Sequence, residues 1–316
     1  MFKALREKKL EFLKWRGVAM TVSAILILAS IALLATRGLN WGLDFTGGIL
    51  VEVGFPQAAD LPALREELQK SGFDDAVVQL FGTEKDVTVR LPAKEGQNAE
   101  EIGNAVQRVL ADFEPNIDIR RIESVGAAVG EELAEKGSLA MLIALICIMI
   151  YVTLRFEWKF ALGSVLALIH DVTITLGFFS LFQVDFDLTV LAAILAVIGY
   201  SLNDTIVVFD RIRENFRLVR SGTPINIINT SLNQTLSRTL MTSLTTLLVL
   251  VALFVLGGAM IHSFAEALIV GVLVGTYSSI YVASSAAISL GVKKEDLVQV
   301  QVEKEGADQE NLADYF

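Results

Sequence analysis

Six apolar runs constrain the fold of this chain more than any other feature, because each approaches the length of a helix that crosses a lipid bilayer. Hydrophobic residues make up 53% of the chain, and the mean hydropathy of +0.56 is high for a soluble protein. Backbone that faces lipid must satisfy its own hydrogen bonds, so such runs are helical. The runs are Val18–Ala35, Ser138–Leu154, Phe160–Phe182, Leu188–Phe209, Thr239–Gly257 and Phe264–Leu290. The sequence therefore predicts a membrane protein built on an all-α bundle of six transmembrane helices.

The first run follows a basic segment, which is also how a cleaved signal peptide begins. The sequence after it, Leu33-Leu-Ala-Thr-Arg37, lacks the small-x-small pattern of a cleavage site. We therefore interpret residues 18–35 as the first span, preceded by a short N-terminal segment at residues 1–17.

Basic residues mark one side of the predicted bundle, and lysine and arginine resist translocation across the membrane. The alternate turns, Gln183–Asp187 and Gly258–Ser263, contain neither residue type. Both termini are therefore expected to be cytoplasmic, with residues 36–137 on the outer side, residues 138–290 forming the other five spans and residues 291–316 forming a cytoplasmic tail. The basic residues that set this orientation, besides those of the N-terminal segment, are Arg155, Lys159, Arg211, Arg213, Arg217, Arg220, Lys293 and Lys294.

Asp204 lies inside the fourth run, where a charged side chain costs at least a few kcal/mol unless it is protonated, paired or hydrated. Burial and a nearby cation act on the pKa of a carboxyl group in opposite directions, so an acid held between them can gain and lose a proton. This makes Asp204, with Asn203 beside it, a candidate proton relay. The alternative is a buried polar residue that only fixes the packing of the helices.

Arg238 lies directly before the fifth run and enters the membrane from the same side as Asp204, so an ion pair between the two helices is expected. The arginine stands in a hydroxyl-rich sequence, and hydroxyl groups hold water or bond to neighbouring helices. The alternative is an arginine that extends its charge to the lipid headgroups.

His170 and Asp171 lie about midway along the third run. Histidine exchanges protons near neutral pH, so the pair is a further relay candidate. The two side chains could equally satisfy each other in a purely structural role. No metal-ligand spacing lies near this pair. The single Cys147 cannot form an intrachain disulfide. The chain has no strongly basic domain, so the sequence does not indicate a nucleic acid partner.

The outer segment reads as a small α+β domain in the order βαββαβ, the ferredoxin-like pattern. Asp60 is the expected N-cap of its first helix, and residues 82–86 are the expected hairpin turn. It contains no histidine, cysteine or nucleophile motif, so we interpret it as a binding or lever element and predict no enzyme activity and no cofactor. The expected elements are a strand at Ile49–Phe55, a helix at residues 60–71, strands at Ala76–Phe81 and Val87–Leu91, a helix at Glu100–Phe113 and a strand at Ile117–Ile122.

A glycine-rich motif, Gly42-Leu-Asp-Phe-Thr-Gly-Gly48, precedes the first strand of this domain. By itself the motif is a turn-rich entry to a strand, and Asp44 could be only a cap. Gly42, Gly47 and Gly48 provide the backbone freedom of a hinge, and Thr46 belongs to the same motif.

Several motifs together resemble the SecD/SecF family of protein-export membrane proteins, which is related to the resistance-nodulation-division superfamily of transporters. The resemblance covers nearly the whole chain. Of the two kinds of chain in the family, this one resembles the smaller, with six spans and one small outer domain. Ala127 and the sequence Ala283-Ser-Ser285 depart from the family where proline is often found. The motifs are Gly42–Gly48, His170-Asp-Val172, the sequence from Gly199 to Asn215 that contains Asp204, Gln234–Thr239 and Gly275-Thr-Tyr-Ser-Ser279.

The resemblance implies a multi-pass protein of the bacterial inner membrane, with residues 36–137 in the periplasm. It implies that the chain works with SecD beside the SecYEG translocon, cooperates with YajC and YidC, and uses the proton-motive force to promote export of unfolded preproteins. Carried over by position, Asp204 is the proton-binding carboxylate and Arg238 is its cationic modulator.

Two other functions remain open from the sequence. The chain could be a proton-coupled exporter of small molecules or lipids that assembles with a copy of itself, since transporters of this kind are often built from related halves. It could also be a non-transporting assembly factor of the translocon. Sodium could replace the proton as the coupling ion.

Overall fold

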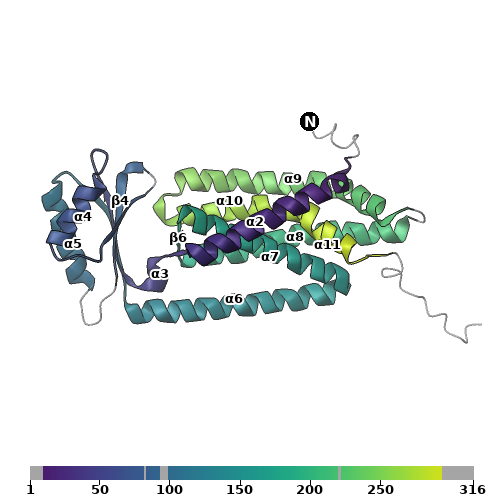
Figure 1. Ribbon diagram of the computed structural model, residues 1–316, viewed down its shortest axis with the longest axis horizontal. Coiled ribbons are helices and arrows are strands. Elements are labelled where there is room, and N and C mark those ends of the chain that lie inside the picture. The colour runs from purple at the N-terminus through teal and green to yellow at the C-terminus, as the bar shows by residue number, and fades with distance from the viewer. Residues whose placement is uncertain (1–9, 82, 93–98, 220–221, 294–316) are drawn as a thin grey trace, which may run out of the picture.

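The computed structural model describes residues 10–81, 83–92, 99–219 and 222–293. Most of the expected N-terminal segment at residues 1–17, the turn residue Gly82, the basic Arg220 and most of the expected tail at residues 291–316 lie outside the described residues. Six helices are long and apolar enough to cross a membrane. They form a bundle with a small α+β domain at one end (Figure 1).

The bundle is built from long helices that run along its length, beside the small domain (Figure 1). A short 3₁₀ turn at Phe12–Trp15 leads into the first helix, and the last membrane crossing is a helix interrupted by a π-helical turn. The elements are α2 (Arg16–Thr36), α6 (Ala127–Arg155), α7 (Trp158–Phe182), α8 (Leu188–Leu218), α9 (Pro224–Leu256), α10 (Ala259–Ser278), the π-helical turn (Ser279–Ala283) and α11 (Ser284–Ser289).

The helices α8 and α9 continue well beyond the apolar runs, which corrects the loop expected after Phe209 and the helix start expected at Thr239. The side-chain amide of Asn215 on α8 donates to Ser231 Oγ and Gln234 Oε1 on α9, both at 2.8 Å. The end of an apolar run predicts where the lipid region ends, and it does not predict where the helix ends. Polar contacts such as those of Asn215 hold α8 and α9 together beyond the lipid region.

The helix α6 begins at Ala127, before the apolar run expected from Ser138. Its polar first turns carry an ion pair between Lys136 and Glu132, one turn apart. At the same end of the bundle α10 begins at Ala259, so the turn expected at Gly258–Ser263 is shorter than predicted.

Close packing of α10 against α8 forms the centre of the bundle. A Cβ atom added at Gly275 would come within 3.1 Å of Ser201 Cβ, and one at Gly271 would overlap Val197. Small residues one turn apart let two membrane helices approach closely. In contrast, α6 stands apart from the other helices along much of its length (Figure 1) and exposes apolar side chains such as Leu142 and Ile146.

The small domain contains a four-stranded antiparallel sheet in the order β3-β4-β2-β5. Its helices α4 and α5 cover the face turned away from the bundle (Figure 1). Asp60 Oδ1 accepts a hydrogen bond from Ala63 N at 3.1 Å and caps α4, as expected. The elements are β2 (Gly48–Gly54), α4 (Leu61–Lys70), β3 (Val77–Phe81), β4 (Thr83–Leu91), α5 (Ala99–Phe113) and β5 (Asp118–Val125).

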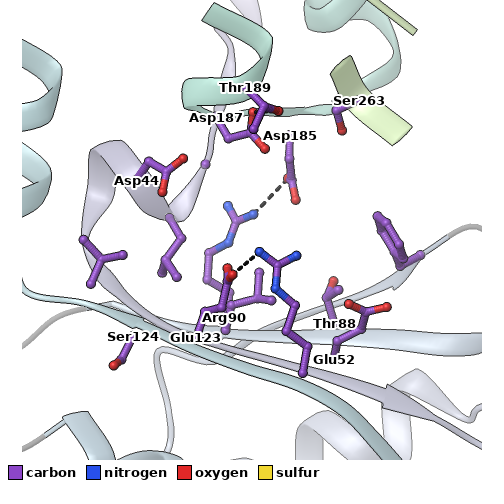
Figure 2. A pocket seen from close by; sticks show the side chains of 16 residues that line it. Asp44, Glu52, Thr88, Arg90, Glu123, Ser124, Asp185, Asp187, Thr189 and Ser263 are labelled. Carbon is purple, nitrogen blue, oxygen red and sulfur yellow. Dashed lines mark hydrogen bonds and ion pairs between the residues drawn. The ribbon is translucent and has the colours of Figure 1, made fainter. Parts of the chain in front are cut away.

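Strand alternation gives the sheet one apolar and one polar face. Val51 and Val53 on β2 are fully buried against α4 and α5, in one core with Leu64 and Val106. Glu52, between the two valines, lies on the opposite face, which is turned toward the bundle (Figure 2). The polar face of the sheet is therefore the part of the domain closest to the membrane helices.

The strand β4 begins at Thr83, so the turn expected at residues 82–86 is shorter than predicted. Backbone hydrogen bonds from Phe55 N to Lys85 O at 2.8 Å and from Ala59 N to Glu84 O at 2.9 Å hold this polar segment. Pairing with the chain that follows β2 thus overrides the turn-like composition.

Two short strands that the sequence did not indicate connect the domain to the bundle. β1 (Asn40–Trp41) pairs in parallel with β6 (Asp185–Phe186), which corrects the simple turn expected at Gln183–Asp187. A short helix, α3 (Leu43–Thr46), follows β1. Strands of two residues are too short to show a hydrophobic periodicity in the sequence.

Candidate functional site

Asp204 lies on α8 with 6% of its surface exposed. Thr239 Oγ1 on α9 donates a hydrogen bond to Asp204 Oδ1 at 2.8 Å, and Ser279 Oγ donates to Oδ2 at 2.6 Å. Both carboxylate oxygens are therefore satisfied by hydroxyl groups from two neighbouring segments.

A second buried carboxylate, Asp171 on α7, has no exposed surface. Its Oδ2 atom accepts hydrogen bonds from Ser201 Oγ at 2.5 Å and Ser278 Oγ at 2.7 Å. Its Oδ1 atom lies 2.8 Å from Nδ1 of His170. The neighbouring residues His170 and Asp171 thus contact each other directly, and Asp171 also joins α7 to α8 and α10.

The two carboxylates meet at adjacent residues of one segment, because Ser278 donates to Asp171 and Ser279 donates to Asp204. The π-helical turn begins at Ser279, and such turns occur often at functional sites. A rotation or shift of this segment would change the hydrogen bonds of both carboxylates together.

The polar cluster extends from His170 to α2. Nε2 of His170 lies 3.1 Å from Ser23 Oγ, and Ser23 Oγ lies 3.1 Å from the hydroxyl of Tyr277. The Tyr277 hydroxyl donates to the carbonyl of Ala19 at 2.7 Å. A continuous chain of polar contacts therefore joins α2 to Asp171 inside the bundle.

The structure does not bring every predicted residue into this cluster. Arg238 precedes Thr239, but its side chain is exposed, and no ion pair joins it to Asp204 in the described part of the chain. The ion pair expected from the sequence is replaced by the hydroxyl groups of Thr239 and Ser279. Asn203 is likewise exposed, because it lies outside the buried face of α8 that carries Asp204.

The glycine-rich motif contacts the outer end of the helix that carries Asp204. Oδ2 of Asp44 accepts a hydrogen bond from Leu188 N at 3.0 Å, at the first residue of α8. Gly42 N donates to Phe186 O at 2.7 Å, and a Cβ atom at Gly42 would come within 2.9 Å of Asp187 Cβ. Asp44 therefore binds the first backbone N–H group of α8, whereas its own short helix α3 has no side-chain cap.

The remaining residues of the motif shape its backbone. Thr46 Oγ1 donates to Gly42 O at 3.1 Å. Gly47 and Gly48 have φ values of 64° and 121°, in the region that favours glycine. A Cβ atom at Gly130 on α6 would come within 2.9 Å of Gly47 N. The motif is packed on both sides, against α6 and against the start of α8.

Arg90 on β4 joins the small domain to the bundle (Figure 2). Its Nη2 atom lies 2.9 Å from Asp185 Oδ1, and its Nη1 atom donates to Trp41 O at 2.9 Å. The side chains of Arg90 and Asp185 are only 14% and 21% exposed, so this ion pair is shielded from much of the screening that weakens surface pairs.

Among the described residues, no group of three or more histidine, cysteine or acidic side chains could hold a metal ion. Cys147 is exposed on α6. The site is thus a set of carboxylate, hydroxyl and imidazole groups, which can exchange protons.

Comparisons with known proteins agree with this architecture. The family description "Protein export membrane protein SecD/SecF, C-terminal" matches residues 105–293, and "SecD/SecF GG Motif" matches residues 32–59. The chain is 55% identical to the protein translocase subunit SecF of Vibrio alginolyticus over 98% of each chain. It is 48% identical to the subunit of the same name from Escherichia coli O157:H7, over 96% of this chain and 95% of that one.

Two solved structures are also similar. The crystal structure of SecDF from Thermus thermophilus, a translocon-associated membrane protein, matches with a TM-score of 0.81 and 37% identity. The match covers 90% of this chain but 39% of that one. SecDF in a super-membrane-facing form matches with a TM-score of 0.63 and 40% identity, over 87% of this chain and 38% of that one.

Sequence reasoning missed most of the hydroxyl groups that hold the two carboxylates. Ser201, Ser278 and Ser279 lie in runs where serine is common and carries no signal by itself. The adjacent serines do stand in the sequence from Gly275 to Ser279, which carried part of the resemblance. Their partners became visible only through the packing of α10 on α7 and α8.

Replacing Thr239 with valine tests the hydrogen bond to Asp204, because valine keeps the shape of threonine and removes its donor. We expect the infrared C=O band of protonated Asp204, identified by its loss in Asp204→Asn, to move to higher frequency in Thr239→Val. Thr242→Val is the matched control, since among the described residues Thr242 Oγ1 bonds only to the backbone of its own helix. An unmoved band in Thr239→Val, or an equal shift in the control, would contradict the geometry.

Proposed function

Because the chain belongs to the SecD/SecF family of protein-export membrane proteins, as a SecF-type subunit that acts in protein translocation, we propose that it couples proton movement at Asp204 to that translocation. The observation that carries the proposal is a buried carboxylate in a spanning helix, held only by neutral hydroxyl donors among the described residues. An ionisable group in a membrane span is a functional candidate by default. No ion pair with a cation of the described residues fixes Asp204 in one charge state, so the group is suited to exchange a proton.

His170 and Asp171 are the second part of the proposed relay. Asp171 accepts a hydrogen bond from Ser278, the last residue of α10, and Asp204 accepts one from Ser279, the first residue of the π-helical turn. Breaking the bond to Ser279 when Asp204 changes its charge would also disturb Ser278 and thus Asp171. In this mechanism the end of α10 and the π-helical turn that follows it move between two hydrogen-bonded arrangements, which gives the alternation a bistable element.

We propose that the small domain is a ferredoxin-like periplasmic domain that moves with α8. Its strand order, all antiparallel, and its two helices on one face support the fold. The contacts of Asp44 and Arg90 at the outer end of the bundle supply the mechanical connection. The glycines at positions 42, 47 and 48 would then set the limits of the movement as a hinge.

The proposed orientation places the chain in the bacterial inner membrane with both termini in the cytoplasm. The basic residues support it, because they gather at the bundle end opposite the small domain. There Arg155 pairs with Asp210 at 2.8 Å and Arg213 pairs with Glu157 at 3.2 Å. Residues 36–137 then lie on the periplasmic side, as the positive-inside rule requires.

SecD is the proposed partner, and the exposed side chains of Asn203 and Arg238 support this. A guanidinium group within a span is costly unless a partner or water covers it. The similar SecDF chain from Thermus is more than twice as long as the part matched by this chain, which leaves room for a second half. We propose that SecD covers Arg238 and turns its charge toward Asp204. The SecYEG translocon, YajC, YidC and the unfolded preprotein are the further expected partners.

Two rival functions have less support. An exporter of small molecules or lipids is disfavoured by the near full-length similarity to translocase subunits. A non-transporting assembly factor would not need a buried carboxylate with neutral partners.

Asp204→Asn should abolish gradient-dependent preprotein export while the protein stays inserted and bound to SecD. The amide has nearly the shape of the acid but exchanges no proton. Export is measured in inverted membrane vesicles that lack the native copy. The matched control is Asp112→Asn on the exposed surface of α5. Full activity of the Asp204 variant would exclude the proton relay.

Arg238→Lys should retain part of the activity and Arg238→Met should be inactive in the same vesicles, because lysine keeps the positive charge and loses only the planar geometry. Equal activity of arginine and methionine at this position would show that Arg238 only reaches the lipid headgroups. Both variants must copurify with SecD for the comparison to be valid.

A further inference from the structure

A cavity of about 360 Å³ lies between the polar face of the sheet and the outer end of the bundle (Figure 2). Its volume is within the range of small-molecule sites. Side chains of β2, β4 and β5 form one wall, and the segment that leads into α8 forms the other. Ser124 and Thr189 line the cavity and are exposed, so it opens to the surface.

Carboxylates outnumber guanidinium groups in the lining of this cavity by five to two. Both guanidinium groups already have acidic partners, because Arg90 pairs with Asp185 and Arg121 pairs with Glu123. Asp44 and Asp187 accept hydrogen bonds from the first backbone N–H groups of α8.

Glu52 is the carboxylate that remains without a partner. It is only 5% exposed, lines the cavity, and makes no hydrogen bond or ion pair with any described residue. Burial raises the pKa of this carboxyl group, which its neighbour Arg121 only partly offsets. A buried acid of this kind is costly as an anion unless a cation is brought to it.

The geometry favours an organic cation over a metal ion. The described acidic side chains form no group close enough to hold a metal, so the charge is spread around a wide cavity. Phe81 also lines the cavity, and an aromatic ring attracts an ammonium or guanidinium group. Nε of Arg90 is buried without a hydrogen-bond partner in the described part of the chain.

We propose that this cavity binds the basic side chain of an extended polypeptide, with Glu52 as the counter-ion of its ammonium or guanidinium group. The proposal rests on the proposed function, because it assigns a contact between the small domain and the exported chain. It adds a preference for lysine and arginine at a defined place. Binding needs no proton gradient, so the site can be tested separately from the relay.

The test uses the full-length chain in lipid nanodiscs and a fluorescent peptide, Gly-Ser-Lys-Ser-Gly, with blocked ends. A matched peptide carries norleucine in place of lysine, and binding is followed by fluorescence anisotropy. We expect the norleucine peptide to bind about tenfold more weakly, as for the loss of one charged hydrogen bond. Glu52→Gln should weaken binding of the lysine peptide by about the same factor, whereas the control Asp112→Asn should not change it.

Thermal unfolding of Glu52→Gln separates binding from folding. Since Glu52 makes no hydrogen bond in the described structure, its variant should unfold at the same or a higher temperature than the unaltered chain at neutral pH. The proposal is overturned if Glu52→Gln binds the lysine peptide normally, or if both peptides bind equally or not at all. It is also overturned if the variant unfolds at a lower temperature than the control, or if sodium or calcium alone binds in a Glu52-dependent way. Asp204→Asn should bind the peptide normally, so a failed relay and a failed binding site give different results.

Discussion

The bundle depends on the burial of two carboxylates in a region that should be surrounded by lipid. Asp171 and Asp204 can lie there because hydroxyl groups of neighbouring helices satisfy their oxygens. Those short hydrogen bonds require α10 to lie close to α7 and α8, which the small residues Gly271 and Gly275 permit. The site and the packing of the core are therefore one arrangement, and a change in the charge of either acid acts on both.

The helix α8 links the two buried carboxylates to the small domain. α8 carries Asp204 in its interior and presents its first backbone N–H groups to Asp44 and Asp187 at its outer end. A helix transmits a displacement along its axis because its hydrogen bonds are regular. Arg90 adds a largely buried ion pair from the sheet to the bundle at the same end. In the proposed mechanism, this contiguous set of contacts is the physical route between proton binding and domain movement.

The sequence was most informative where it shows a hydrophobic periodicity or places a charged residue in an apolar run. Six apolar runs predicted the spans, and Asp204 was identified because a charge in lipid is costly. Helix ends were predicted poorly, since the polar ends of α6, α8 and α9 are held by tertiary contacts such as that of Asn215. Ser278 and Ser279 gave no physical signal of their own, because serine is tolerated anywhere in a span, and they entered only as part of a family motif. The pairing of β1 with β6 and the unpartnered state of Glu52 depend on contacts between residues far apart in sequence.

The central claim is that proton binding at Asp204 moves the small domain relative to the bundle. Double electron–electron resonance tests it directly, with spin labels at Asp112→Cys on α5 and Phe182→Cys at the outer end of α7, both exposed, in a Cys147→Ser background. In the SecD-bound complex, the account predicts a distance distribution that changes with pH and becomes independent of pH in Asp204→Asn. A distribution that stays the same at all pH values, or that changes equally in the Asn variant, would contradict the account.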